Sequence, residues 1–196
     1  MTETDLLLLV RAETRAHHQQ LEAKLPFDER LSLERYQELL AGFWGLFDPL
    51  EAALANLDLA DSLEVRKRQR SVLLLRDLLA TGLTAEELSV LPRCDKVPLL
   101  ETKAQALGCM YVLEGSRLGG QFASKLVTQQ LGLTEGSGCS FFSSDGAEVA
   151  PMWRTFCDIV RESVLSPEDR SEFVVAARST FSAFLGWIGR SDAKLV

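Results

Sequence analysis

The sequence contains two histidines, His17 and His18, which are adjacent and lie near its N-terminus. A neutral imidazole is a good ligand for iron and leaves the opposite coordination position of the metal open. The helical pattern that carries both histidines runs from about Thr4 to Lys24 and stops before Pro26. Adjacent residues on a helix point about 100° apart, so only one of the two histidines can face a given ligand directly.

On this helix, His18 lies in the middle of a stripe of six residues that fall within about 80° of one another. The stripe consists of Leu7, Arg11, Thr14, His18, Leu21 and Leu25. We expect it to face the core, so that His18 points inward and His17 does not. Arg11 lies two turns before His18, about 10 Å along the axis, which suits a cation that binds a carboxylate at the rim of a ligand held by His18. Glu22, one turn after His18, could orient the imidazole; alternatively, it could be the partner of a histidine that only packs in the core.

A second feature is a set of four glycines within thirteen residues of a later helical pattern: Gly108, Gly115, Gly119 and Gly120. Each costs about 0.5–1 kcal/mol relative to alanine in a helix interior, so the set removes a large part of a domain's net stability. One face of the helix carries Gly108, Gly115 and Gly119, with Tyr111, Leu118 and Phe122 beside them. Such a face admits a flat apolar ligand against the backbone, and Gly119-Gly120 permits a kink.

The alternative for these glycines is close packing against another helix. Polar residues in the same stretch exclude the version of this packing found in membrane dimers: Glu114, Ser116, Arg117 and Gln121. Ser116 is the short hydroxyl beside the two central glycines, and it could hydrogen-bond either a ligand-bound water or the preceding turn.

The elements that position these two helices are predicted to be helices as well. Apolar residues recur at three- and four-residue spacing, and no segment alternates with a period of two. We therefore predict an all-α fold in a single domain over residues 1–196. Pro49 should kink or end the second helix, and Ser166 with Pro167 should start the last one. The predicted helices after the first are 33–47 (resuming at 50–54), 63–80, a short one after a capping box at Thr84 and Glu87, 99–131, 152–164 and 167–188, with a loop over 132–150.

Composition excludes several classes of protein. The net charge of -7 argues against non-specific binding to nucleic acid. The four cysteines include no CxxC pair and the chain has no Glu-x-x-His pair, so the spacings typical of zinc and di-iron sites are missing. The run Leu6–Val10 is too short for a signal peptide and follows acidic residues, and no apolar stretch approaches ~20 residues. We expect a soluble cytoplasmic protein with no membrane or nucleic-acid partner.

Together, the two helices resemble those of the haem oxygenase family. In that family's proximal helix a threonine precedes the iron-binding histidine by four positions and a glutamate follows it by four, a register that selects Thr14, His18 and Glu22. The segment 111–121 resembles the distal helix, whose Gly-x-x-x-Gly-Gly-Gln pattern is matched by Gly115, Gly119, Gly120 and Gln121. The resemblance is close over residues 1–25 and 108–130. In animal members an aspartate follows the first distal glycine, whereas this sequence has Ser116 at that position. Its Leu-Glu-Gly-Ser sequence instead resembles that of bacterial members, including those associated with bacteriophytochromes.

The resemblance implies an enzyme that uses haem b as both substrate and cofactor, bound between the proximal helix and a kinked distal helix. His18 would hold the iron, and dioxygen would bind beside Gly115, Ser116, Gly119 and Gly120. The products would be biliverdin, carbon monoxide and ferrous iron. No Gly-x-Gly-x-x-Gly motif follows a strand, so electrons would come from a separate ferredoxin or reductase. The bilin would supply a bacteriophytochrome, or the reaction would release iron.

Further residues are expected to contact haem. Tyr111, Leu118 and Phe122 would flank it on the distal side. Arg11 and Arg178 would pair with its propionates, and Phe181, three residues after Arg178, would lie along the pocket edge. The alternative for Arg178 is a solvated helix face.

Three other functions stay open at this point. The first is a haem carrier or sensor without turnover. The second is a relative with the same helical fold but another activity, such as the thiaminase-like proteins. The third is a structural helical adaptor, which the cost of the glycines disfavours.

Overall fold

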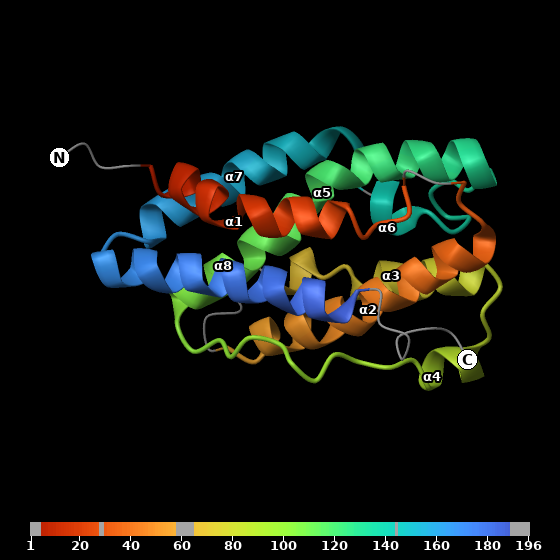
Figure 1. Cartoon of the computed structure of the whole chain (residues 1–196), viewed down its shortest axis with the longest axis horizontal. Helices are drawn as coiled ribbons and strands as arrows, with labels where there is room; N and C mark the ends of the chain where they lie inside the picture. Colours follow the sequence, from red (N-terminus) through yellow and green to blue (C-terminus); the bar gives the residue numbers. More distant parts are fainter. Residues whose placement is uncertain (1–4, 28–29, 58–64, 144, 189–196) are drawn as a thin grey trace.

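The computed structural model describes residues 5–27, 30–57, 65–143 and 145–188. In these ranges the fold is all-α with no strand, as predicted, and Figure 1 shows helices that run largely along one long axis. The elements are α1 (Leu6–Glu22), α2 (Leu33–Ala55), η1 (Val65–Arg68), α3 (Ser71–Ala80), α4 (Ala85–Ser89), α5 (Lys103–Leu131), α6 (Ser140–Ser143), η2 (Gly146–Glu148), α7 (Val149–Ser163) and α8 (Pro167–Trp187).

Helix α8 supports the rest of the bundle. It begins as predicted, with Pro167 in its first turn and a capping box in which the Ser166 hydroxyl accepts from the Asp169 N–H at 3.0 Å. Its buried residues include Phe173, Ala177 and Phe181. Both α1 and α5 pack along α8 but make little direct contact with each other. The two helices that carry the predicted chemistry are therefore placed by a common neighbour.

Helices α5 and α8 approach each other closely at Gly108. A Cβ atom there would lie 2.2 Å from the Phe173 carbonyl oxygen and 2.9 Å from the Ala176 Cβ. Backbone cannot move aside as a flexible side chain can, so only glycine fits. Gly108 is therefore explained by close helix packing, the alternative considered above for the glycines.

We expect Gly108→Ala to destabilise the protein by about 1–3 kcal/mol or more, because the added methyl group must push α5 away from α8. Denaturant unfolding measures this change as a lower midpoint. Gly186→Ala on α8 is the control: a Cβ at position 186 would meet nothing within 4 Å, so the midpoint should stay or rise. Equal midpoints for the two variants would contradict the packing role of Gly108.

Helix α2 continues through Pro49, where we predicted a kink or an end. Proline has no N–H, so the carbonyl of Gly45, four residues earlier, loses its helical partner. That carbonyl instead accepts the Cys94 N–H at 2.7 Å, from the connector between α4 and α5. The connector can approach this closely because position 45 is glycine: a Cβ there would lie 2.5 Å from the Pro92 carbonyl oxygen.

The predicted helix 63–80 is instead η1 followed by α3, and residues 63–64 lie outside the described ranges. The break comes at Arg70, where buried Glu51 of α2 intervenes. Its Oε1 accepts the Arg70 N–H at 2.7 Å and its Oε2 accepts the Ser71 N–H at 3.1 Å. A carboxylate distant in sequence therefore caps the start of α3, and local patterning does not reveal it.

The predicted loop 132–150 also contains short helices, α6 and η2, and α7 begins at Val149 rather than at Met152. Here the cap is Asp77 of α3, which is fully buried and accepts the Ser140 and Phe141 N–H groups at 2.8 and 2.7 Å. Helix α5 starts at Lys103, four residues later than predicted, after the Thr102 side chain accepts the Gln105 N–H. Across the described ranges, every helix is too short or too polar to cross a bilayer.

Candidate functional site

The side of α1 that faces the core differs from the predicted stripe. Leu6, Val10 and Thr14 are buried against the rest of the bundle, and His17 continues this face as a half-buried residue. His18 is exposed, with 58% of its side chain accessible, so the expectation that it points into the core is wrong. The reason is that α8 packs along α1, whose buried side, at Leu6, Val10 and Thr14, lies about 40–120° around the helix from His18.

The exposed imidazole of His18 is nevertheless held in place. Its Nδ1 lies 3.3 Å from Oε2 of Glu22, the residue predicted to orient it, and its ring makes an edge contact with Phe181 of α8 at 6.0 Å between centroids. Nε2 makes no hydrogen bond to the residues that the structure describes. A carboxylate on one ring nitrogen, with the other nitrogen open, is the arrangement of a metal-binding histidine.

Two neighbours of His18 have packing roles. The Thr14 hydroxyl is buried and donates to the Val10 carbonyl at 2.7 Å. The His17 ring is half-buried, 6.4 Å from the Phe181 ring, and its Nδ1 is buried without a hydrogen-bond partner in the described chain. His17 is therefore less accessible to a ligand than His18, although the prediction had His18 as the inward-facing residue of the two.

The glycines of α5 divide into two kinds. Nothing lies within 4 Å of a Cβ built on Gly119, and at Gly115 the nearest atoms are those of the Trp153 ring at 3.8 Å, an ordinary contact. At Gly120 a Cβ would lie 3.2 Å from the Phe142 carbonyl oxygen. Close packing therefore explains Gly108 and Gly120, while Gly119 borders open space and Gly115 would tolerate a Cβ in ordinary contact with Trp153. Gly120, predicted to belong to the reactive face, lies instead on the packed side of α5.

We call the side of α5 with Gly115 and Gly119 the open face. Leu118 and Phe122 beside it are 44% and 64% exposed, unusually accessible for large apolar side chains. Ser116 is exposed, and its hydroxyl donates to the Leu113 carbonyl at 2.6 Å, the preceding-turn contact that was one of its two expected roles. Figure 1 shows α5 changing direction along its length, as a kinked distal helix requires.

Tyr111 and Arg11 connect the open face to α1. The Tyr111 ring is half-buried against Trp153 and Phe173, at 5.5 and 5.9 Å. Burial raises the pKa of Tyr111, and the positive charge of Arg11 acts in the opposite direction. Arg11 shares its side of α1 with His18, and Tyr111 shares its side of α5 with Gly115. Arg11 and Tyr111 therefore lie on the sides of α1 and α5 that were predicted to face a ligand.

Arg178 has a different surrounding from the one predicted. Its Nη1 lies 3.5 Å from Oε2 of Glu13, and both side chains are about half exposed. Glu13 is on the flank of α1 away from Arg11 and His18. This position matches the solvated helix face that was the alternative for Arg178. Phe181, one turn later, is buried beneath both histidine rings.

A buried ionic network behind the open face was not predicted. Arg117 of α5 pairs with Glu114 at 3.3 Å and with Asp145 at 2.7 Å, and Arg68 reaches Glu114 at 3.3 Å. Its further members are Arg70 and Glu51: burial lowers the pKa of Arg70 to about 10 and raises that of Glu51. The three-residue spacing of Glu114 and Arg117 was a visible signal. The partners from η1 and from the segment after α6 could not be paired from sequence.

The cysteines are not competing ligands for iron. All four are buried as free thiols: Cys94, Cys109, Cys139 and Cys157. Burial raises the pKa of Cys109 to about 12 and that of Cys139 to about 11, so neither forms a thiolate readily at neutral pH. In the ranges that the structure describes, no three His, Cys, Asp or Glu side chains gather as a metal site.

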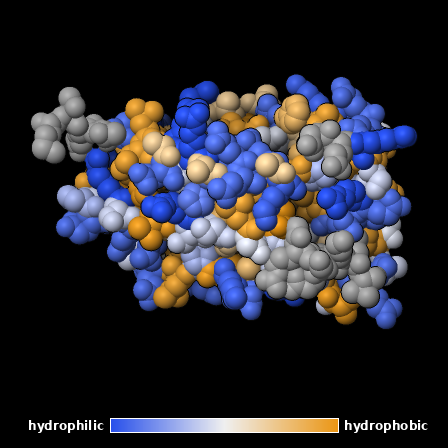
Figure 2. Space-filling model, in the orientation of Figure 1, coloured by the Kyte–Doolittle hydropathy of each residue, from blue (hydrophilic) through white to orange (hydrophobic). Residues whose placement is uncertain are grey.

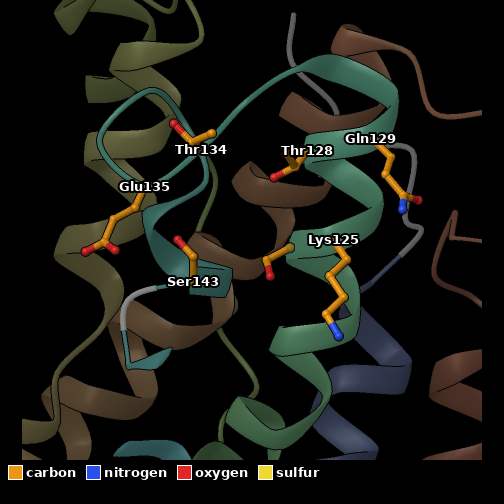
Figure 3. Close-up of a pocket in the computed structure, with 7 residues that line it drawn as sticks. Lys125, Thr128, Gln129, Thr134, Glu135 and Ser143 are labelled. Carbon is orange, nitrogen blue, oxygen red and sulfur yellow. The ribbon is translucent and has the colours of Figure 1, made fainter. Parts of the chain in front are cut away.

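A polar groove of about 370 Å³ lies at the far end of α5 (Figure 3). Lys125 and Gln129 of α5 border it on one side, and Glu135 and Ser143 on the other. None of the predicted site residues lines it. On the face shown in Figure 2, apolar side chains are exposed in separate patches.

In the described ranges the protein is all-helical, with an exposed histidine on α1 and a glycine-containing helix, α5, that packs along the same neighbour, α8. The model of the family described as "Heme oxygenase" matches residues 4–190. The chain belongs to the haem oxygenase family and is a haem-degrading oxygenase.

Solved structures share this fold. Haem oxygenase from Neisseria meningitidis, determined with NO and CO bound, is 22% identical with a TM-score of 0.76, over 99% of this chain and 94% of that one. The enzyme from Leptospira interrogans is 19% identical with a TM-score of 0.75, over 94% and 98%. Haem oxygenase-1 from the cyanobacterium Synechocystis, in complex with haem, is 13% identical with a TM-score of 0.71, over 94% and 91%. No curated protein sequence matches the chain.

Proposed function

We propose that this chain, acting as a single domain, cleaves haem b with dioxygen and external electrons to give biliverdin, carbon monoxide and ferrous iron. The observation that carries the proposal is that α5 leaves open space beside Gly119 while α1 carries the exposed His18, whose Nδ1 contacts Glu22 and whose Nε2 is free to bind. Haem bound between them would supply the iron that binds oxygen and the ring that is oxidised.

His18 is proposed as the iron ligand on the proximal side. The Glu22 carboxylate, 3.3 Å from Nδ1, would favour the tautomer in which Nδ1 carries the proton and Nε2 keeps its lone pair. The Phe181 ring limits rotation of the imidazole from below. This pair of contacts would fix the direction in which the iron is held.

On the distal side, Gly115 and Gly119 would leave room for dioxygen, while Leu118 and Phe122 cover part of the apolar ring. The Ser116 hydroxyl already donates its hydrogen bond to the Leu113 carbonyl. Its oxygen can still accept a hydrogen bond from water. We therefore propose that protons arrive through ordered water, and that Ser116→Ala has a modest effect on the rate.

Arg11 is proposed to bind a haem propionate. We expect Arg11→Ala to weaken haem binding by roughly 1.5–3 kcal/mol, the contribution of a charge-assisted hydrogen bond. Haemin titration followed at the Soret band measures this change. Arg35→Ala is the control, because Arg35 is similarly exposed but pairs with Glu38 on α2. Arg178→Ala should resemble the control, since its guanidinium faces Glu13. An unchanged affinity in Arg11→Ala would contradict the pairing.

Reconstitution tests the function directly. The protein is loaded with haemin, given a reductant and air, and the bilin isomer is identified by chromatography. Biliverdin with release of carbon monoxide supports the proposal. Stable haem binding without bilin would favour a carrier or sensor, and failure to bind haem would favour a thiaminase-like activity.

Two partners complete the proposal. The chain has no dinucleotide-binding motif, so a ferredoxin or a separate reductase would supply electrons in the cytoplasm. The bilin would pass to a bacteriophytochrome, or the released iron would be the useful product. Adding the reaction mixture to an apo-bacteriophytochrome separates these uses, because chromophore assembly gives a photochromic spectrum.

A further inference from the structure

Arg117 lies behind the open face of α5. It is two residues from Gly115 and two from Gly119, which places its side chain roughly 160° around the helix axis from both. Its side chain is 5% exposed, whereas nothing lies within 4 Å of a Cβ at Gly119. This short stretch of α5 therefore has no packed neighbour beside Gly119, whereas on the opposite side Arg117 is buried among other residues.

The guanidinium joins α5 to two separate segments of the chain. Nη1 donates to Oδ2 of Asp145 at 2.7 Å, from the segment after α6, and Nη2 donates to the Arg68 carbonyl at 3.1 Å, from η1. Nε lies 3.3 Å from Oε2 of Glu114, one turn earlier on α5 itself. One residue after Gly120, the Gln121 amide donates to the Gly146 carbonyl at 2.8 Å. The bonds from Arg117 to Asp145 and to the Arg68 carbonyl leave from the packed side of α5.

A helix segment with glycine at positions 115, 119 and 120 has little intrinsic resistance to bending or unwinding. Its geometry must therefore come from outside contacts. A planar guanidinium with several donors in a fixed fork restrains rotation of the helix better than a single flexible contact does.

We infer that Arg117 is a positioning residue for the oxygen-binding face: through Asp145 and the Arg68 carbonyl it fixes the rotation and bend of α5, and so the placement of Gly115 and Gly119 over haem. The inference rests on the proposed function, because it assigns the open face to oxygen.

The test variant is Arg117→Met with Asp145→Asn, which removes one positive and one negative charge together. Arg161→Met with Asp158→Asn is the matched control, because that pair, 2.8 Å apart on α7, is an exposed ion pair away from the network. Amide hydrogen exchange of the haem-free protein is expected to accelerate about tenfold or more at residues 115–122 in the test variant alone. With haem, the same variant should keep the histidine-ligated Soret band but give a mixture of bilin isomers. Arg117→Lys should restore part of the parent isomer ratio.

Unchanged exchange at 115–122, or equal acceleration in all helices, would overturn the inference. So would faster exchange combined with an unaltered isomer ratio and rate. A parent protein that makes no bilin would refute the proposed function instead, and the exchange experiment would still decide whether Arg117 holds α5.

Discussion

His18→Ala is expected to abolish both the histidine-ligated Soret spectrum and bilin formation. The structure leaves Nε2 of His18 available, while Glu22 holds Nδ1 and all four cysteines are buried. Loss of this imidazole removes the proposed iron ligand without opening the core, since the side chain is largely exposed. We therefore expect near-parental unfolding, measured by denaturant titration, together with the complete spectral change, measured by absorption of the haemin complex.

His17→Ala is the matched control for this experiment. Its ring is half-buried against Phe181, so we expect a stability loss of about 1 kcal/mol with the spectrum and turnover retained. A His18→Ala protein that keeps the parent spectrum, with the loss appearing in His17→Ala instead, would refute the assignment.

Gly119→Ala is expected to separate stability from chemistry. A methyl group there meets nothing within 4 Å, so alanine should leave the protein as stable or stabilise it by roughly 0.5–1 kcal/mol. The same methyl group would occupy the space proposed for bound oxygen. Haem should still bind, while bilin formation should slow at least tenfold or shift to another isomer, as chromatography of the products would show.

Gly120→Ala provides the comparison, because its methyl group would meet the Phe142 carbonyl at 3.2 Å on the packed side. We expect it to lower the melting temperature and to have the smaller effect on the bilin made by the folded protein. If Gly119→Ala were destabilised yet formed the same bilin at the normal rate, the assignment of the open face to oxygen would be wrong.

Local chemistry in the sequence predicted much of the fold. The capping box at Thr84 and the N-cap Ser166 with Pro167 after it correctly located helix starts, because such signals depend on residues within one turn. The break before α3 and the short helix α6 were missed, because Glu51 and Asp77 cap them from other helices. Such caps depend on tertiary contacts that periodicity does not contain.

The site was predicted unevenly for the same reason. The spacing of His18 and Glu22 predicted their contact, because both lie on one helix. The direction of His18 was wrong, since α1 carries adjacent apolar sides and only the position of α8 decides which is buried. The glycines likewise could not be divided into packed and open ones, because Phe173 and Phe142, which approach Gly108 and Gly120, are remote in sequence.

Pro49 has a consequence for engineering the protein. Replacing a proline inside a helix by alanine normally improves the helix, but here alanine would add an N–H aimed at the Gly45 carbonyl, which already accepts the Cys94 N–H. Two N–H groups would then share one carbonyl oxygen, so each would affect the geometry of the other's hydrogen bond. The backbone at positions 49 and 94 is therefore energetically coupled, and Pro49→Ala should not be additive on stability with Cys94→Pro, which removes the N–H.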